Sequence, residues 1–74
     1  MVRIENIIWG EDVISMDCYE EGKKERHIAL VLDANTFQII SPAMEILNFY
    51  IGQAIAKIRR VKNEKPTSLI VACY

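Results

Sequence analysis

Apolar residues alternate with other residues along the first half of the chain, and this alternation limits the fold more than any other feature. Every second residue is apolar within residues 14–18 and again within residues 28–32. A period of two places successive side chains on opposite faces, which is typical of a β-strand with one face in a core. We therefore predict strands around 14–18 and 28–32, joined by a charged turn at 20–25, and a further strand at 37–40.

The two turns test this assignment, because strand pairing must keep the apolar residues on one face. A three-residue loop at 22–24 pairs apolar residues across the first turn: Ile14 with Leu32, Met16 with Leu30 and Cys18 with Ile28. A two-residue loop at 34–35 does the same across the second turn: Leu32 with Phe37 and Leu30 with Ile39. Both turns predict one buried sheet face with the same apolar residues.

The first strand is predicted at residues 2–9. A loop at 10–12 would place Ile4 opposite Cys18 and Ile8 opposite Ile14, with Asn6 among apolar neighbours. Ile7 and Trp9 would then point to the opposite face of the sheet, because successive side chains alternate.

A spaced apolar stripe indicates a long helix after residue 41. Ser41 offers an N-cap hydroxyl, and Pro42 suits the first helical position, where its missing N–H has no cost. The apolar positions that follow recur at steps of three and four: Met44, Leu47, Ile51, Ala54, Ile58 and Val61. Such a stripe is typical of a helix packed on a sheet, and residues 63–66 are predicted to end it.

The tail at residues 67–74 is predicted to form the last strand, apolar on both faces and so expected to be covered on both sides. It can lie parallel to the strand at 37–40 or antiparallel to the first strand. The prediction is an α+β fold over a single domain at residues 1–74. It has a single, mostly antiparallel sheet, element order β-β-β-β-α-β, and one long helix packed on one face.

The face opposite the helix is predicted to be too apolar to face water. The residues placed there as a candidate self-association face are Ile7, Trp9, Val13, Tyr19, Val31 and Ile40. A chain of 74 residues has a small core, and such domains often gain stability from a partner. We therefore expect a non-enzymatic interaction module that forms a homodimer or joins a larger complex.

The net charge of −1 is unevenly distributed, with −5 over residues 1–56 and +4 over residues 57–74. The basic side chains of the second segment form a candidate polyanion contact: Lys57, Arg59, Arg60, Lys62 and Lys65. No aromatic residue is interleaved with them, and the pI of about 5.7 is below the range typical of nucleic-acid-binding domains. Binding of nucleic acid or another polyanion is therefore the less favoured alternative.

The sequence contains no motif for a nucleotide cofactor, no C-x-x-C pair and a single histidine, so we expect no cofactor and no metal. If Cys18 lies opposite Ile28, then His27 points to the other face together with Asp17, and a Cys–His nucleophilic pair is not formed. We expect free thiols at Cys18 and Cys73, a cytoplasmic location and no membrane contact.

Overall fold

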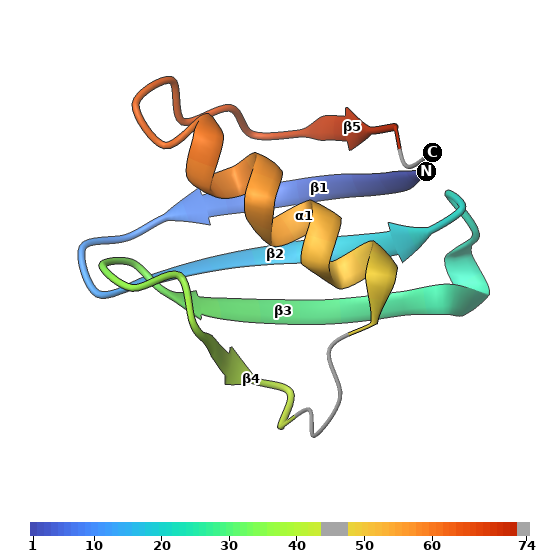
Figure 1. Cartoon of the computed structure of the whole chain (residues 1–74), viewed down its shortest axis with the longest axis horizontal. Helices are drawn as coiled ribbons and strands as arrows, with labels where there is room; N and C mark the ends of the chain where they lie inside the picture. Colours follow the sequence, from blue (N-terminus) through green and yellow to red (C-terminus); the bar gives the residue numbers. More distant parts are fainter. Residues whose placement is uncertain (44–47, 73–74) are drawn as a thin grey trace.

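The computed structural model describes residues 1–43 and 48–72. Its elements in chain order are β1 (Val2–Trp9), β2 (Val13–Glu20), the 3-10 turn η1 (Lys24–Arg26), β3 (His27–Asp33), β4 (Ile39–Ser41), α1 (Phe49–Arg60) and β5 (Leu69–Val71). The strands form one sheet in the order β4-β3-β2-β1-β5, with every neighbouring pair antiparallel, and α1 lies across it (Figure 1). The predicted α+β fold is confirmed, and β5 takes the position antiparallel to β1.

The pairing of β2 with β3 follows the predicted register throughout. Ile14 lies opposite Leu32, Met16 opposite Leu30 and Cys18 opposite Ile28. All of these except Ile28, which packs against the core, are buried. The alternation of apolar residues predicts the register of β2 and β3 correctly because the pairing of these two strands has no irregularity.

A β-bulge in β1 changes the predicted faces. Ile4 lies opposite Cys18 as predicted, but the register shifts by one residue between Glu5 and Ile8. Asn6 takes a φ of 53° at this point and is exposed rather than buried. An extra residue reverses every face beyond it, so Trp9 lies opposite Ile14 and Ile8 opposite Ser15.

The predicted tight turn between β3 and β4 is wrong by two residues. Leu32 lies opposite Ile39 rather than Phe37, because residues 33–38 form a wider loop. The N–H of Asp33 donates to Gln38 O and the N–H of Phe37 donates to Asp33 O, each at 2.8 Å. Phe37 takes a φ of 62°, which turns its side chain into the core, where it is 8% exposed.

The helix begins later than predicted. Ser41 belongs to β4 and pairs with Val31, so it does not cap a helix. The cap is Asn48, whose side-chain oxygen accepts from the N–H of Ile51 at 2.8 Å. The predicted stripe residues Met44 and Leu47 lie outside the described residues, and the stripe from residue 51 onward is buried as predicted: Ile51, Ala54, Ile58 and Val61.

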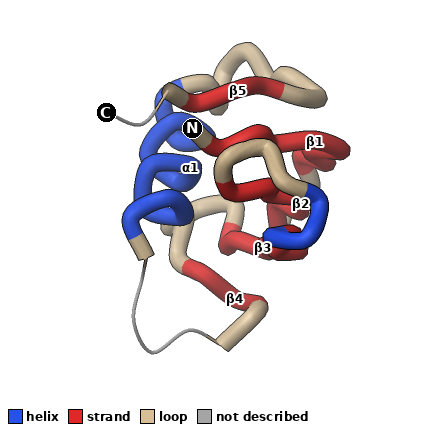
Figure 2. Tube along the Cα trace, turned by 90° about the vertical axis from the view of Figure 1, so that its right-hand side faces the viewer, coloured by secondary structure: helices blue, strands red, loops and turns tan. Residues whose placement is uncertain are grey.

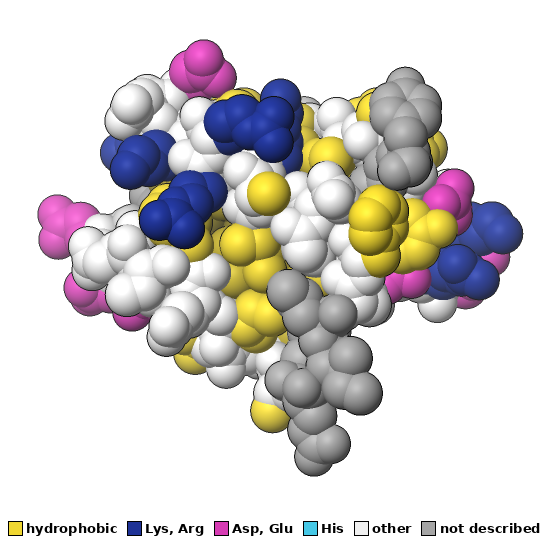
Figure 3. All heavy atoms as spheres, viewed as in Figure 1, with side chains coloured by type: hydrophobic (Ala, Val, Ile, Leu, Met, Phe, Trp, Pro, Cys, Tyr) yellow, Lys and Arg dark blue, Asp and Glu magenta, His cyan; other side chains and the backbone are white. Residues whose placement is uncertain are grey.

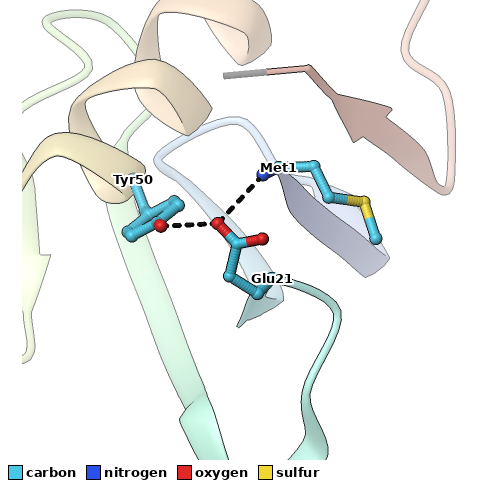
Figure 4. A network of polar contacts seen from close by, with 3 residues as sticks. All are labelled: Met1, Glu21 and Tyr50. Atoms are coloured by element: carbon cyan, nitrogen blue, oxygen red, sulfur yellow. Dashed lines mark hydrogen bonds and ion pairs between the residues drawn. The ribbon is translucent and has the colours of Figure 1, made fainter. Parts of the chain in front are cut away.

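Two acidic residues at the end of β2, Glu20 and Glu21, contact the start of α1. Glu20 Oε1 accepts from the Asn48 side-chain amide at 2.8 Å. Glu21 Oε1 accepts from the Tyr50 hydroxyl at 2.5 Å and forms an ion pair with the amino group of Met1 at 3.3 Å (Figure 4). The hydrogen bond from Tyr50 lowers the pKa of Glu21, and the Met1 amino group lowers it further. These contacts join the start of β1, the end of β2 and the first turn of α1.

The core lies between α1 and one face of the sheet (Figure 2). Its fully buried large side chains are Val2, Ile4, Cys18, Leu30, Leu32, Ile51 and Ile58. The last strand is shorter than predicted and not covered on both sides, because Val71 is buried whereas Ile70 is 60% exposed. Within residues 1–43 and 48–72, no helix is long and apolar enough to cross a membrane.

Candidate functional site

The sheet has a face on the side away from α1, which we call the open face. The registers of the paired strands place the following side chains on the open face: Arg3, Glu5 and Ile8 of β1; Val13, Ser15, Asp17 and Tyr19 of β2; His27, Ala29 and Val31 of β3; and Ile70 of β5. Figure 2 shows that α1 lies on the other side of the sheet. Figure 1 shows that η1 lies at the end of the β2–β3 hairpin and not over the strands. No described helix covers the open face.

Apolar side chains occupy one end of the open face. Ile8 is 65% exposed and pairs across the sheet with Ser15, which pairs in turn with Val31. Val13, two residues before Ser15 on the same strand, is 41% exposed. Ile40 is 52% exposed on the edge strand β4. Of the predicted candidate residues, Val13 and Val31 therefore share this end of the face with Ile8, and Ile40 is exposed on the adjoining edge strand β4.

Two predicted members of this face lie elsewhere. Ile7 is 4% exposed and belongs to the core, and Trp9 packs against the core from the same side. The bulge at Asn6 is the reason, because it exchanges the faces of all later residues in β1. Ile8, which the alternation places opposite Ile14 in the core, is exposed for the same reason. Asn within an apolar strand was the available signal, since Asn tolerates positive φ better than most residues.

A polar network occupies the middle of the open face. Asp17 accepts a hydrogen bond from the Asn6 side-chain amide at 2.8 Å, and its other oxygen lies 2.7 Å from His27 Nε2. Asp17 and His27 lie on the same face as predicted, and the structure brings them into contact. Hydrogen bonds from Asn6 and then from His27 lower the pKa of Asp17. Tyr19 stacks on the His27 ring with centroids 5.0 Å apart, which leaves Tyr19 at the polar end of the face.

Cys18 lies on the opposite side of the sheet from this network. It is a free thiol, fully buried under α1, and burial raises its pKa to about 12. A thiol that stays protonated is a poor nucleophile, and the sheet separates it from His27. The prediction that Cys18 and His27 do not form a pair is confirmed. Cys73 lies outside the described residues.

The five predicted basic residues lie around the C-terminal end of α1, where Figure 3 shows lysine and arginine side chains together. They divide into separate groups. Lys57 and Arg60 line a groove of about 420 Å³ beside Ile70 of β5. Arg59 lies over the ring of Phe37, 5.8 Å from its centroid. Lys62 and Lys65 line a different pocket, and no ion pair among the described residues involves any of the five.

The pocket of Lys62 and Lys65 also contains aromatic residues. It has a volume of about 290 Å³, and Trp9 and Phe37 line it together with the two lysines. We call it the basic–aromatic pocket, defined by Trp9, Phe37, Lys62 and Lys65. The predicted absence of interleaved aromatics is correct along the sequence but wrong in space, because Trp9 is brought here by β1. No spacing in the sequence indicates this contact.

Among residues 1–43 and 48–72, no group of three or more His, Cys, Asp or Glu side chains has a geometry that could hold a metal ion. No family model, no curated protein and no solved structure matches this chain. The open face and the basic–aromatic pocket are therefore the two places from which a function can be argued.

Proposed function

We propose that this protein is a non-enzymatic interaction module that self-associates through the open face of its sheet. The observation that carries the proposal is Ile8, which is 65% exposed on a face that no described helix covers. Val13 lies on the neighbouring strand β2, and Val31 lies on β3, one strand further across the same face. Burying one isoleucine of this kind contributes about 1.5–3 kcal/mol, and the others add to it.

The chemistry of the open face suits a second copy of the same chain. A two-fold interface requires a surface that is complementary to itself. The open face carries Arg3 next to Glu5 on one strand and Asp17 across from Glu5 on the next, so both signs of charge are available. A two-fold rotation can set the basic side chain of each copy against an acidic one while the apolar ends meet.

Association by strand addition at an edge is less favoured than association face to face. Both edge strands, β4 and β5, have only three residues. A short edge offers few backbone hydrogen bonds to a partner, which is one way in which proteins limit edge pairing. The open face is formed by the much longer strands β1, β2 and β3 and offers more area.

Sedimentation at low and high salt tests the proposal. We expect a dimer at micromolar concentrations that weakens little in salt, because its apolar contacts are not screened and the solvent-exposed charge pairs around them contribute little. The variant Ile8→Glu should be monomeric. Phe49→Glu is the matched control, since Phe49 is 55% exposed on the helix and should not affect association. A monomer at both salt concentrations for the unmodified chain would overturn the proposal, as would equal dimerisation of Ile8→Glu.

A further inference from the structure

We propose that the basic–aromatic pocket binds a nucleotide, that is, a planar base with its phosphate, either free or as part of a single strand. This pocket lies on a different surface from the open face and does not depend on self-association. It is formed by the turn after β1, the loop after β3 and the segment after α1. The lining residues that the argument uses are Trp9, Glu11, Phe37, Lys62, Asn63 and Lys65.

The cations of the pocket are available to a phosphate. Lys62 and Lys65 are exposed, and neither has an ion-pair partner among the described residues. Arg59, over the ring of Phe37, adds a third positive charge next to the pocket. Residues 57–74 have a net charge of +4, so the field around this end of the molecule attracts anions although the whole chain is slightly acidic.

Trp9 offers a surface on which a base can stack. Its side chain is half-buried, and the indole N–H donates to Pro66 O at 2.8 Å. This bond ties the ring to the same segment that carries Lys62 and Lys65, so the distance between ring and cations is set by the fold. Aromatic rings beside a basic surface are the usual means by which proteins bind unpaired bases, because every base has a π-face.

Two unusual backbone conformations are found at this one pocket. Phe37 has a φ of 62° and Lys65 a φ of 49°, both in the left-handed region that residues with side chains rarely adopt. Both residues line the pocket. Unusual backbone of this kind is concentrated at functional sites, which supports a binding role for this pocket.

Glu11 gives the pocket a direction. Glu11 also lines the pocket, and its carboxylate repels a phosphate in its vicinity. It can accept hydrogen bonds from the N–H groups of a base, and the Asn63 amide offers a further polar contact. The phosphate is therefore expected at the lysines and the base at Trp9.

Tryptophan fluorescence tests this inference directly, because Trp9 is the only tryptophan in the chain. The probes are an oligothymidylate of about ten nucleotides, thymidine monophosphate and inorganic phosphate. We expect saturable quenching by the oligonucleotide, with an affinity that falls roughly tenfold for a fourfold rise in salt if two or three phosphates are bound. Equal quenching by the monophosphate assigns the site to free nucleotides, and a preference for the oligonucleotide assigns it to single strands.

Charge-reversal variants separate a site from general attraction. The double variant Lys62→Glu with Lys65→Glu should weaken quenching at least tenfold. The matched control is Lys23→Glu with Lys24→Glu, which gives the same net charge at exposed residues of the hairpin at the opposite end of the sheet. Equal weakening by both pairs would overturn the inference. So would the absence of saturable quenching by either nucleotide probe, or an equal effect of inorganic phosphate. Circular dichroism confirms that each variant is folded.

Discussion

Asn6 determines which side chains of β1 reach the core. Its φ of 53° produces the extra residue between Glu5 and Ile8, and its amide donates to Asp17. In a regular strand, a protein with valine at a given position is more stable than one with glycine there by up to about 1 kcal/mol. At a positive φ the order reverses, because a side chain with a branched Cβ is strained by about 1–2 kcal/mol and glycine is not.

We therefore expect Asn6→Gly to be more stable than Asn6→Val in urea unfolding. Both variants lose the hydrogen bond to Asp17, so that loss cancels when the two are compared. If Asn6→Val were the more stable of the two, β1 would have no bulge, and Ile7 would not be a core residue.

Cys18 is expected to react only when the protein unfolds. Its thiol is buried and its pKa is raised to about 12, so the thiolate that reacts with iodoacetamide is scarce in the folded state. Measurement in a Cys73→Ser variant leaves Cys18 as the only thiol. The alkylation rate should rise with urea in parallel with unfolding. Fast alkylation in the absence of urea would mean that α1 does not cover this part of the sheet.

Two aspartates make stability depend on acid. Hydrogen bonds from Asn6 and His27 lower the pKa of Asp17, and hydrogen bonds from the N–H groups of Thr36 and Asn35 lower the pKa of Asp33. A carboxyl whose folded-state pKa is depressed contributes stability that is fully present above its unfolded pKa of about 3.9. That contribution is lost as the pH falls through the folded-state pKa.

The urea concentration at the unfolding midpoint should accordingly decrease as the pH is lowered from about 5 to about 2. The double variant Asp17→Asn with Asp33→Asn should lose less stability over this range, because neither position then titrates. Asp12→Asn, at an exposed turn residue, is the control and should behave as the unmodified chain. Equal acid sensitivity in all three proteins would contradict the assignment of the effect to Asp17 and Asp33.

At the scale of elements, the apolar face of α1 carries much of the stability. Ile51 and Ile58 are fully buried against the sheet. Replacement of either by alanine leaves a cavity and should cost about 2–5 kcal/mol. Arg60→Ala, on the exposed side of the same helix, should change the free energy of unfolding by less than about 0.5 kcal/mol. Similar small effects at all three positions would mean that the helix does not pack as described.

The start of α1 can be tested in the same way. Asn48 caps the helix through Ile51 and also donates to Glu20, so Asn48→Ala should cost about 1–2 kcal/mol. Ser41→Ala should be nearly neutral, because Ser41 is a strand residue whose pairing uses the backbone. The opposite result in thermal or urea unfolding would move the start of the helix to the predicted position at residue 42.

For the whole molecule, stability should depend on protein concentration if the open face associates. A partner that binds only the folded state raises the unfolding temperature by mass action. A tenfold rise in concentration should raise the Tm by roughly 3–5 °C for a domain of this size. The Ile8→Glu variant should show one Tm at all concentrations. A concentration-independent Tm in the unmodified chain would contradict self-association in the measured range.

Sequence patterns alone predicted the fold class, the register of β2 with β3 and the buried positions of α1 from Ile51 onward. It also placed Asp17 and His27 together on the face away from Cys18. These features follow from periodicity, because a repeat of two or of 3.6 residues fixes a face wherever the element is regular. Each of these predictions rests on patterns within single elements and the turns between them, and none requires a contact between distant parts of the chain.

Other features depend on one irregular residue or on a contact between distant parts of the chain, and these are visible only in the folded molecule. Because of the bulge at Asn6, Trp9 lies on the core side of the sheet, and its indole N–H donates to Pro66 O. The backbone N–H of Ile7 donates to Thr67 O at 2.9 Å. Phe37 has a left-handed backbone conformation, so the turn after β3 is wider than predicted and the Phe37 side chain packs in the core. A one-residue shift has a small local cost but reverses a whole face, so only the sum of long-range contacts selects it. That sum created the basic–aromatic pocket and removed Ile7 and Trp9 from the open face.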